Sequence, residues 1–334
     1  IKKNLYDIPN ARKVHKNAIP RLGGICFLPC TLIAFIFGIA ILNQLTGRRQ
    51  ITIGTWSVMF LISLSLIYII GIVDDIVGVR PRTKFAVQII AASLLPLSGL
   101  YINNMYGMFG IHELPFWVGA PLTVFVLVFI DNAMNLIDGI DGLCSGLALL
   151  ALGAFGGWFC WNHLYVYGMM AMGIAGVVSV FFFYNVLGRR MKIFMGDTGS
   201  LTLGFLIAFF GLKFYNLNIN TDMFGIQATP AVFLGIVFIP AFDTLRVFCV
   251  RIASGLSPFY PDKRHIHHKM LRLGLTHFQS AMLIIVMQTC FILMNVLMMN
   301  VNINLLFGID LLLGVLLVWQ LDRMGDRRER KGKA

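Results

Sequence analysis

Four short polar blocks interrupt an apolar sequence, and each carries side chains suited to phosphate chemistry. Carboxylates at 74–75, 131–141 and 196–200 could hold a divalent cation, and histidines with basic neighbours at 263–269 could hold phosphate oxygens. Phosphoryl transfer needs both parts, because a metal neutralises phosphate oxygens while positioned donors fix the reacting groups in line. The residue types therefore predict a phosphoryl-transfer site.

The first block is the carboxylate pair Asp74-Asp75, at the end of an apolar run. Two adjacent carboxylates at a helix end are costly unless they share a cation or a proton. Downstream, Lys84 and Gln88 lie one turn apart on one face of the next predicted helix. The alternative is a solvated loop with surface ion pairs.

The second block runs from 131 to 142 and holds three carboxylates and two amides without a basic residue. Asp138 and Asp141 are three residues apart, so a helix or tight turn points them the same way. Asn132 and Asn135 repeat that spacing, and the glycines allow close approach of backbone to a ligand. A polar helix cap is the alternative.

The third block places Asp197 between glycines at the start of an apolar run. A carboxylate at a helix N-terminus suits a magnesium ion whose other ligands are waters and phosphate oxygens. The block lacks the Gly-Lys-Ser/Thr of a P-loop. A plain N-cap is the alternative.

The fourth block contains three histidines among basic residues. Positive charge from Lys263, Arg264 and Lys269 surrounds them, and no cysteine is near. That mixture favours an anionic phosphate over a metal cation. Zinc binding and a solvated basic loop stay open as alternatives. The histidines are His265, His267 and His268.

The elements that position these blocks are membrane helices. The chain has 334 residues, 58% hydrophobic and 13% charged, with a mean hydropathy of +0.80. This composition excludes a soluble enzyme, a disordered protein and a secreted disulfide scaffold. We expect an all-α polytopic integral membrane protein, one domain over 1–334, with catalytic loops at 1–21, 74–84, 131–142, 185–200 and 251–278. The ten predicted transmembrane helices are 22–45, 54–73, 85–101, 116–136, 143–160, 163–184, 201–217, 228–250, 279–300 and 303–321.

The net charge of +12 reports orientation in the membrane. With ten spans, all Lys and Arg residues except Arg48, Arg49 and Lys213 fall on one side or in its loops. The positive-inside rule makes that side cytoplasmic. The four blocks lie there too, so the charge is not a sign of nucleic-acid binding, and the lipid bilayer is the expected environment.

The four blocks, in this order and spacing, resemble those of the polyprenyl-phosphate N-acetylhexosamine-1-phosphate transferases, glycosyltransferase family 4. The matching residues also include an opening stretch from Asp7 to Gly24. The His-Ile-His-His form is similar to the WecA/TagO-like branch, which uses UDP-N-acetylglucosamine (UDP-GlcNAc). Lys269 stands where the pentapeptide-using branch carries a third histidine. Members usually have eleven spans, so we expect that the first is missing before Ile1.

The resemblance implies a role for each block. Asp197 would bind Mg²⁺, which Mn²⁺ could replace, with Asp74 and Asp75 as possible further ligands. Asp74 would act as base or orienter for the lipid phosphate, although a phosphate nucleophile is already ionised at pH 7. The catalytic set is Asp74, Asp75, Asp197, His267 and His268. The substrate-binding set is Lys84, Asn132, Asn135, Asp138, Asp141, Asn185, Phe194, Arg264 and His265.

The implied reaction moves GlcNAc-1-phosphate from UDP-GlcNAc to undecaprenyl phosphate and releases UMP. This would be the first membrane step of a cell-envelope glycan such as lipopolysaccharide or teichoic acid, with the site facing the cytoplasm of a bacterial inner membrane. A homodimer is possible. Alternatives are another UDP-N-acetylhexosamine, UDP-MurNAc-pentapeptide, or a secondary transporter, since acids inside membranes often mark ion pathways. The acids gather at helix ends without a broken-helix repeat, which disfavours transport.

Overall fold

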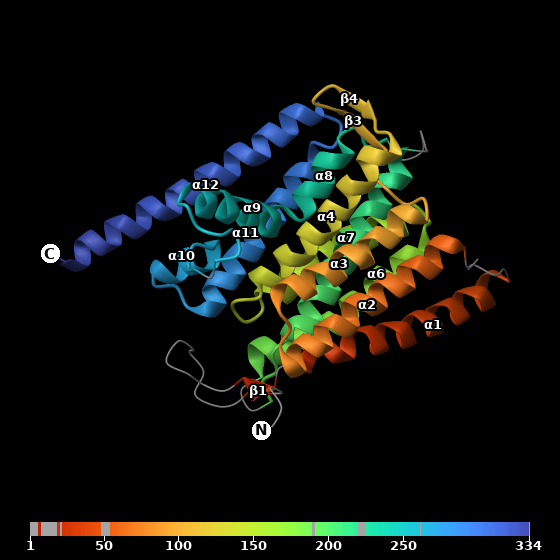
Figure 1. Cartoon of the computed structure of the whole chain (residues 1–334), viewed down its shortest axis with the longest axis horizontal. Helices are drawn as coiled ribbons and strands as arrows, with labels where there is room; N and C mark the ends of the chain where they lie inside the picture. Colours follow the sequence, from red (N-terminus) through yellow and green to blue (C-terminus); the bar gives the residue numbers. More distant parts are fainter. Residues whose placement is uncertain are drawn as a thin grey trace.

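The chain folds into a bundle of long apolar helices, seen in a computed structural model (Figure 1). The structure describes residues 6–7, 19–20, 22–47, 54–188, 191–219, 225–260 and 262–333. Most of the predicted catalytic loop 1–21 and Pro261 of the fourth block lie outside the described residues. The all-α polytopic fold is confirmed, because eight helices in the described part are long and apolar enough to cross a membrane. They are α1 (Phe27–Thr46, preceded by the 3₁₀ turn Leu22–Cys26), α2 (Thr55–Val77), α4 (Phe116–Ile137), α5 (Leu143–Trp161), α6 (Tyr165–Leu187), α7 (Gly196–Ile219), α11 (His277–Leu297) and α12 (Ile303–Lys333).

The predicted count of ten spans is not confirmed. The segment predicted at 85–101 forms α3 (Pro81–Leu97), whose 17 residues are shorter than the other spans. The segment predicted at 228–250 is broken into α8 (Thr229–Ile236) and α9 (Phe238–Ala253), bent by 84°. Counting this bent pair as one span gives up to nine in the described chain.

The break between α8 and α9 has a local cause. Pro240 lacks the N–H that would bond to the Ile236 carbonyl in a continuous helix. Gln288 of α11 satisfies the freed groups: its amide donates to the Gly235 and Ile236 carbonyls at 2.8 and 2.9 Å and accepts from the Ile239 N–H at 2.8 Å. Irregular backbone at membrane depth is tolerated where protein groups replace the lost hydrogen bonds.

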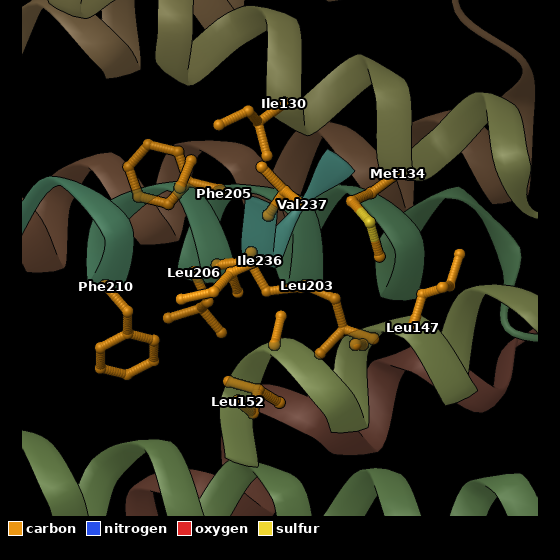
Figure 2. Close-up of a cluster of buried hydrophobic side chains, with 14 of the residues drawn as sticks. Ile130, Met134, Leu147, Leu152, Leu203, Phe205, Leu206, Phe210, Ile236 and Val237 are labelled. Carbon is orange, nitrogen blue, oxygen red and sulfur yellow. The ribbon is translucent and has the colours of Figure 1, made fainter. Parts of the chain in front are cut away.

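Helix α7 forms the centre of the bundle, and 89% of the residues in its apolar stretch are buried. Figure 2 shows its side chains packed between α4 and α5 and against the α8–α9 break. Gly204 lets α4 approach, because a Cβ there would lie 2.8 Å from the Asp131 Cα. The residues at the start of α7 are therefore held by a rigid helix. The labelled core residues are Ile130, Met134, Leu147, Leu152, Leu203, Phe205, Leu206, Phe210, Ile236 and Val237.

The two ends of the bundle differ (Figure 1). One end carries the antiparallel hairpin β3 (Asn104–Met108) and β4 (Ile111–Glu113). The other carries the short helix α10 (Ile266–Arg272), the α4–α5 connection and the strand pair β1 (Tyr6–Asp7) and β2 (Ile19–Pro20). The described parts of the predicted blocks gather at this second end.

Candidate active site

A lysine bridges two acids at the centre of the site. The Lys84 Nζ lies 3.0 Å from Asp74 Oδ2 and 3.3 Å from Asp197 Oδ1, and it donates to Asn135 Oδ1 at 3.5 Å. These side chains come from the last turns of α2 and α4 and the first turns of α3 and α7. Lys84 and Asp74 are 14% and 12% exposed, and Asp197 is 37% exposed. The cluster is thus mostly desolvated, with Asp197 open toward solvent.

Asp75 turns away from Lys84 and caps α7. Its carboxylate accepts from the backbone N–H of Asp197 at 2.8 Å, the backbone N–H of Thr198 at 2.9 Å and the Thr198 hydroxyl at 2.6 Å. A carboxylate at this position satisfies free N–H groups and complements the helix dipole. Gly71 allows the contact, since a Cβ there would lie 2.6 Å from the Thr198 Cα.

The end of α4 joins the cluster through amide side chains. The Asn135 amide donates to Asp197 Oδ1 at 2.5 Å and to Ser200 Oγ at 2.8 Å. Behind it, the Asn132 amide donates to Gln88 Oε1 at 3.0 Å. Asn135 therefore borders the predicted metal position directly, whereas Asn132 links α4 to α3.

The 138–142 loop is held by Asn185 near the end of α6 and by Lys192 of the α6–α7 connection. Asn185 accepts from the Gly142 N–H at 2.7 Å and donates to the Ile193 carbonyl at 2.9 Å. The Lys192 ammonium lies 2.5 Å from Asp141 Oδ2. Asn185, predicted to bind substrate, uses its amide to hold two loops. Lys192 was absent from the predicted site, although a lysine two residues before Phe194 was a visible signal.

Asp138 lies within the field of the other acids. Desolvation by the surrounding protein, followed by the negative charges of Asp197, Asp141 and Asp75, raises the pKa of Asp138 to about 7. All these effects favour the neutral acid; the Asp138 side chain is itself exposed, so the three neighbouring negative charges are the effects that its position in the structure supports. A bound cation would lower this pKa, because it would favour the carboxylate.

Asp243 in α9 anchors the histidine block, and sequence reasoning missed it. Its carboxylate lies 3.0 Å from His265 Nδ1, accepts from the Ile266 N–H at 3.2 and 3.1 Å, and pairs with Arg246 at 2.7 Å. Asp243 is 1% exposed and His265 is 6% exposed. The signal was a carboxylate inside the apolar run 228–250, where it needs a partner. His265 thus fixes the start of α10.

His267 brings the fourth block against the second. It is 3% exposed, and a Cβ on Gly139 would lie 2.6 Å from its Nε2. Burial, followed by the charge of His268, lowers the pKa of His267 to about 3, so the ring is neutral at physiological pH. Burial also lowers the pKa of His268. Within the described structure, His267 Nδ1 has no hydrogen-bond partner.

Three residues singled out in the sequence form their contacts outside the lysine cluster: Arg264, Lys269 and Phe194. Arg264 contacts Asp262 at 3.4 Å, and Lys269 pairs with Asp322 of α12. The Phe194 backbone donates to the Pro20 carbonyl at 2.8 Å and accepts from the Gly23 N–H at 3.0 Å. Phe194 therefore joins the segment at Pro20 and Gly23 to the start of α7.

The oxygen donors of the cluster fit a magnesium ion. In the described part of the chain, no group of three or more His, Cys, Asp or Glu residues is arranged to hold a metal. The carboxylates of Asp74 and Asp197 nevertheless both contact the Lys84 ammonium, at 3.0 and 3.3 Å, and the Asn135 oxygen lies near the same ammonium. Two carboxylates held this close together favour binding of a cation between them. A few oxygen ligands suit Mg²⁺, which keeps several waters and binds substrate phosphates.

The fold and this site define a polytopic membrane protein with an acid-and-lysine centre at one end of its bundle. Residues 55–215 match the model of glycosyl transferase family 4. A Yersinia pestis undecaprenyl-phosphate alpha-N-acetylglucosaminyl 1-phosphate transferase is 32% identical over 295 residues, covering 85% of this chain and 74% of the relative. The chain belongs to glycosyl transferase family 4, as the resemblance of its blocks indicated.

Two further relatives carry similar names. A probable undecaprenyl-phosphate N-acetylglucosaminyl 1-phosphate transferase of Bacillus subtilis (strain 168) is 33% identical over 290 residues, covering 85% of this chain and 74% of the relative. The undecaprenyl-phosphate alpha-N-acetylglucosaminyl 1-phosphate transferase of Escherichia coli (strain K12) is 32% identical over 289 residues, covering 85% and 73%.

Proposed function

We propose that this chain transfers GlcNAc-1-phosphate from UDP-GlcNAc to undecaprenyl phosphate and releases UMP. The carrying observation is the Asp74–Lys84–Asp197 cluster, which gathers a cation and oxygen donors at one end of a membrane bundle. The names of the three relatives support the sugar and the lipid carrier. A nucleophile carried on a lipid also accounts for a site at the membrane surface.

The reaction forms one P–O bond and breaks another. An oxygen of undecaprenyl phosphate attacks the sugar-bearing phosphorus of UDP-GlcNAc, and the bridging oxygen leaves with UMP. The lipid phosphate is already ionised at pH 7, so no proton must be removed from it. Asp74 then acts by holding Lys84 and orienting the acceptor, and Lys84 supplies positive charge to the phosphate oxygens.

Magnesium is part of the proposal. Asp197, Asp74 and Asn135 would hold the ion, and Mn²⁺ would be able to replace it. When bound, it would neutralise charge on the diphosphate oxygens. Asp75 acts through α7, because its oxygens already accept from the backbone at the start of that helix.

The nucleotide and sugar would bind beside the 138–142 loop. Asp138 and Asp141 offer acceptors for hydroxyl and base N–H groups, and His267 borders the loop at Gly139. A neutral His267 would donate a hydrogen bond to phosphate rather than a full positive charge. Asn185 and Lys192 would position the loop.

We further propose that the site faces the cytoplasm of a bacterial inner membrane. This rests on the basic residues of its loops and the positive-inside rule. The lipid product would then serve the synthesis of a cell-envelope glycan such as lipopolysaccharide or teichoic acid. A homodimer stays a prediction that mass measurement in detergent micelles tests.

The deciding experiment uses purified chain with UDP-GlcNAc, undecaprenyl phosphate and Mg²⁺. We expect UMP release, loss of activity with EDTA, and a lipid product whose mass equals undecaprenyl diphosphate plus N-acetylhexosamine. Competing UDP-GlcNAc against other UDP-N-acetylhexosamines and UDP-MurNAc-pentapeptide identifies the sugar. Activity that persisted in both EDTA and Asp197→Asn would remove the metal assignment, and a lipid product bearing another sugar would replace the substrate.

A further inference from the structure

Helix α12 continues beyond its apolar part as a charged helical segment, residues 322–333, which we name the C-terminal extension. At about 1.5 Å per residue, its 31 residues exceed the roughly 30 Å hydrocarbon thickness of a bilayer. Figure 1 shows α12 running past the bundle at the end that carries α10. The extension is therefore available to act on the active-site end.

The extension presents an acidic stripe to α10. Asp322, Asp326 and Glu329 are spaced by four and three residues, which places them on one helix face. Lys269 and Arg272 of α10 face this stripe with the same three-residue spacing. Lys269 pairs with Asp322, and Arg272 pairs with Asp326 at 2.9 Å and with Glu329 at 2.7 Å. The two helices are thus joined by opposite charges in register.

The contact continues at the end of α10. Gly274 follows this helix with φ +76°, a conformation that favours glycine. A Cβ at Gly274 would collide with the guanidinium of Arg328 in the extension. The turn after α10 and the extension are therefore in direct packing contact, in addition to the ion pairs.

The opposite side of α10 carries the site residue. His267 and Met270 are 3% and 0% exposed, and His267 lies against Gly139 of the 138–142 loop. Lys269, two residues after His267, turns about 200° around the helix and meets Asp322 instead. Asp243 holds only the first residues of α10.

We propose that the C-terminal extension holds α10 in place from outside the membrane, with Lys269 and Arg272 as positioning residues for His267. This rests on the proposed function of the site. Lys269, which stands where the pentapeptide-using branch carries a third histidine, thereby forms a contact between two helices. An exposed ion pair alone shifts an equilibrium only about twofold to fivefold, but three ion pairs along one helix face join α10 to the extension.

The test exchanges the charges of one pair. Lys269→Asp, Asp322→Lys and the double variant are assayed for UMP release, with kcat and KM determined separately, and for thermal stability. Each single variant is expected to lower kcat about threefold to tenfold without unfolding the bundle. The double variant is expected to return within about twofold of the original rate, because it restores opposite charges. Arg327→Glu is the matched control, since Arg327 is an exposed cation of the extension with no ion pair to α10 in the described structure.

Hydrogen exchange of the 266–272 amides gives a second reading that does not depend on catalysis. Exchange should accelerate in Asp322→Lys and slow again in the double variant. Unchanged exchange and an unchanged rate in Asp322→Lys, or a double variant no better than the poorer single, would overturn the proposal. An unsubstituted chain that released no UMP, with exchange responding as expected, would instead overturn the proposed function and leave the positioning role in place.

Discussion

The Asp75 carboxylate accepts two hydrogen bonds from Thr198, one from the Thr198 backbone N–H at 2.9 Å and one from the Thr198 hydroxyl at 2.6 Å. Asp75 thereby fixes the first turn of α7. The neighbouring Asp74 faces Lys84 at 3.0 Å. Adjacent residues on a helix point about 100° apart, so the two carboxylates of this pair contact different neighbours. One carboxylate orders the helix that presents Asp197, and the other meets the cation beside Asp197.

Asp75→Asn should therefore weaken the bundle as well as the reaction. The amide keeps one acceptor oxygen but presents N–H groups toward N–H donors, so the cap of α7 is lost. We expect about 1–3 kcal/mol of lost stability, read as a lower unfolding temperature, together with reduced UMP release. The comparison variant is Asp74→Asn, which should lose activity with a smaller change in unfolding temperature. Equal unfolding temperatures for the two variants would contradict the capping role.

Much of the architecture could be predicted from the sequence, because apolar runs near 20 residues permit only helices in lipid. The break at Val237 could not. Pro240 was a visible warning, but the bend needs a partner for the freed backbone, and that partner is Gln288, 48 residues downstream. Long-range satisfaction of this kind leaves no local pattern in the chain.

The candidate site was predicted by residue type more completely than by role. Spacing brought Asp74, Lys84 and Asp197 to one end, since each follows or opens an apolar run. Spacing could not tell that Asp75 caps a helix, because capping depends on which residue of the pair faces α7. Asp243 was overlooked because it lies inside an apolar run, where its partners come from a distant loop.

Lys84→Met should abolish activity and make the unfolding temperature of the chain depend more strongly on divalent cations. Without the ammonium, the negative charges of Asp74 and Asp197 are no longer compensated, and these carboxylates should bind Mg²⁺ more tightly than in the unsubstituted chain. We expect Mg²⁺ to raise the unfolding temperature of Lys84→Met more than that of the unsubstituted chain, with UMP release down about 100-fold or more. Lys84→Arg keeps the charge and serves as the control. An equal response to Mg²⁺ in the Lys84→Met and Lys84→Arg variants would argue against Mg²⁺ binding by Asp74 and Asp197.

His267 should make the fold sensitive to acid. Its pKa is about 3 in the folded chain and about 6.5 when unfolded, so only the unfolded state takes up this proton between those values. Stability is therefore fully present above pH 6.5 and falls as the pH drops toward 3. Between pH 6.5 and 4 the loss amounts to about 3 kcal/mol at most.

His267→Gln removes this proton uptake. The glutamine variant should show a flatter fall in unfolding temperature between pH 6.5 and 4 than the unsubstituted chain. Comparing the two slopes isolates His267 from His268, whose lowered pKa acts in the same direction in both proteins. Equal falls in unfolding temperature for the two proteins would mean that the His267 imidazole has the same pKa in the folded and unfolded states.

Asp243→Asn should detach α10 from α9. The substitution removes the negative charge between His265 and Arg246 while leaving one oxygen for the Ile266 N–H. Arg246 is only 14% exposed, so its charge is left poorly compensated, and we expect about 3–5 kcal/mol of lost stability with a loss of UMP release. Arg246→Gln in the same chain should recover part of the stability, because it removes the stranded charge. UMP release should stay low in this double variant, since the charged anchor of the histidine helix is still missing; full recovery of rate would show that Asp243 serves only to neutralise Arg246.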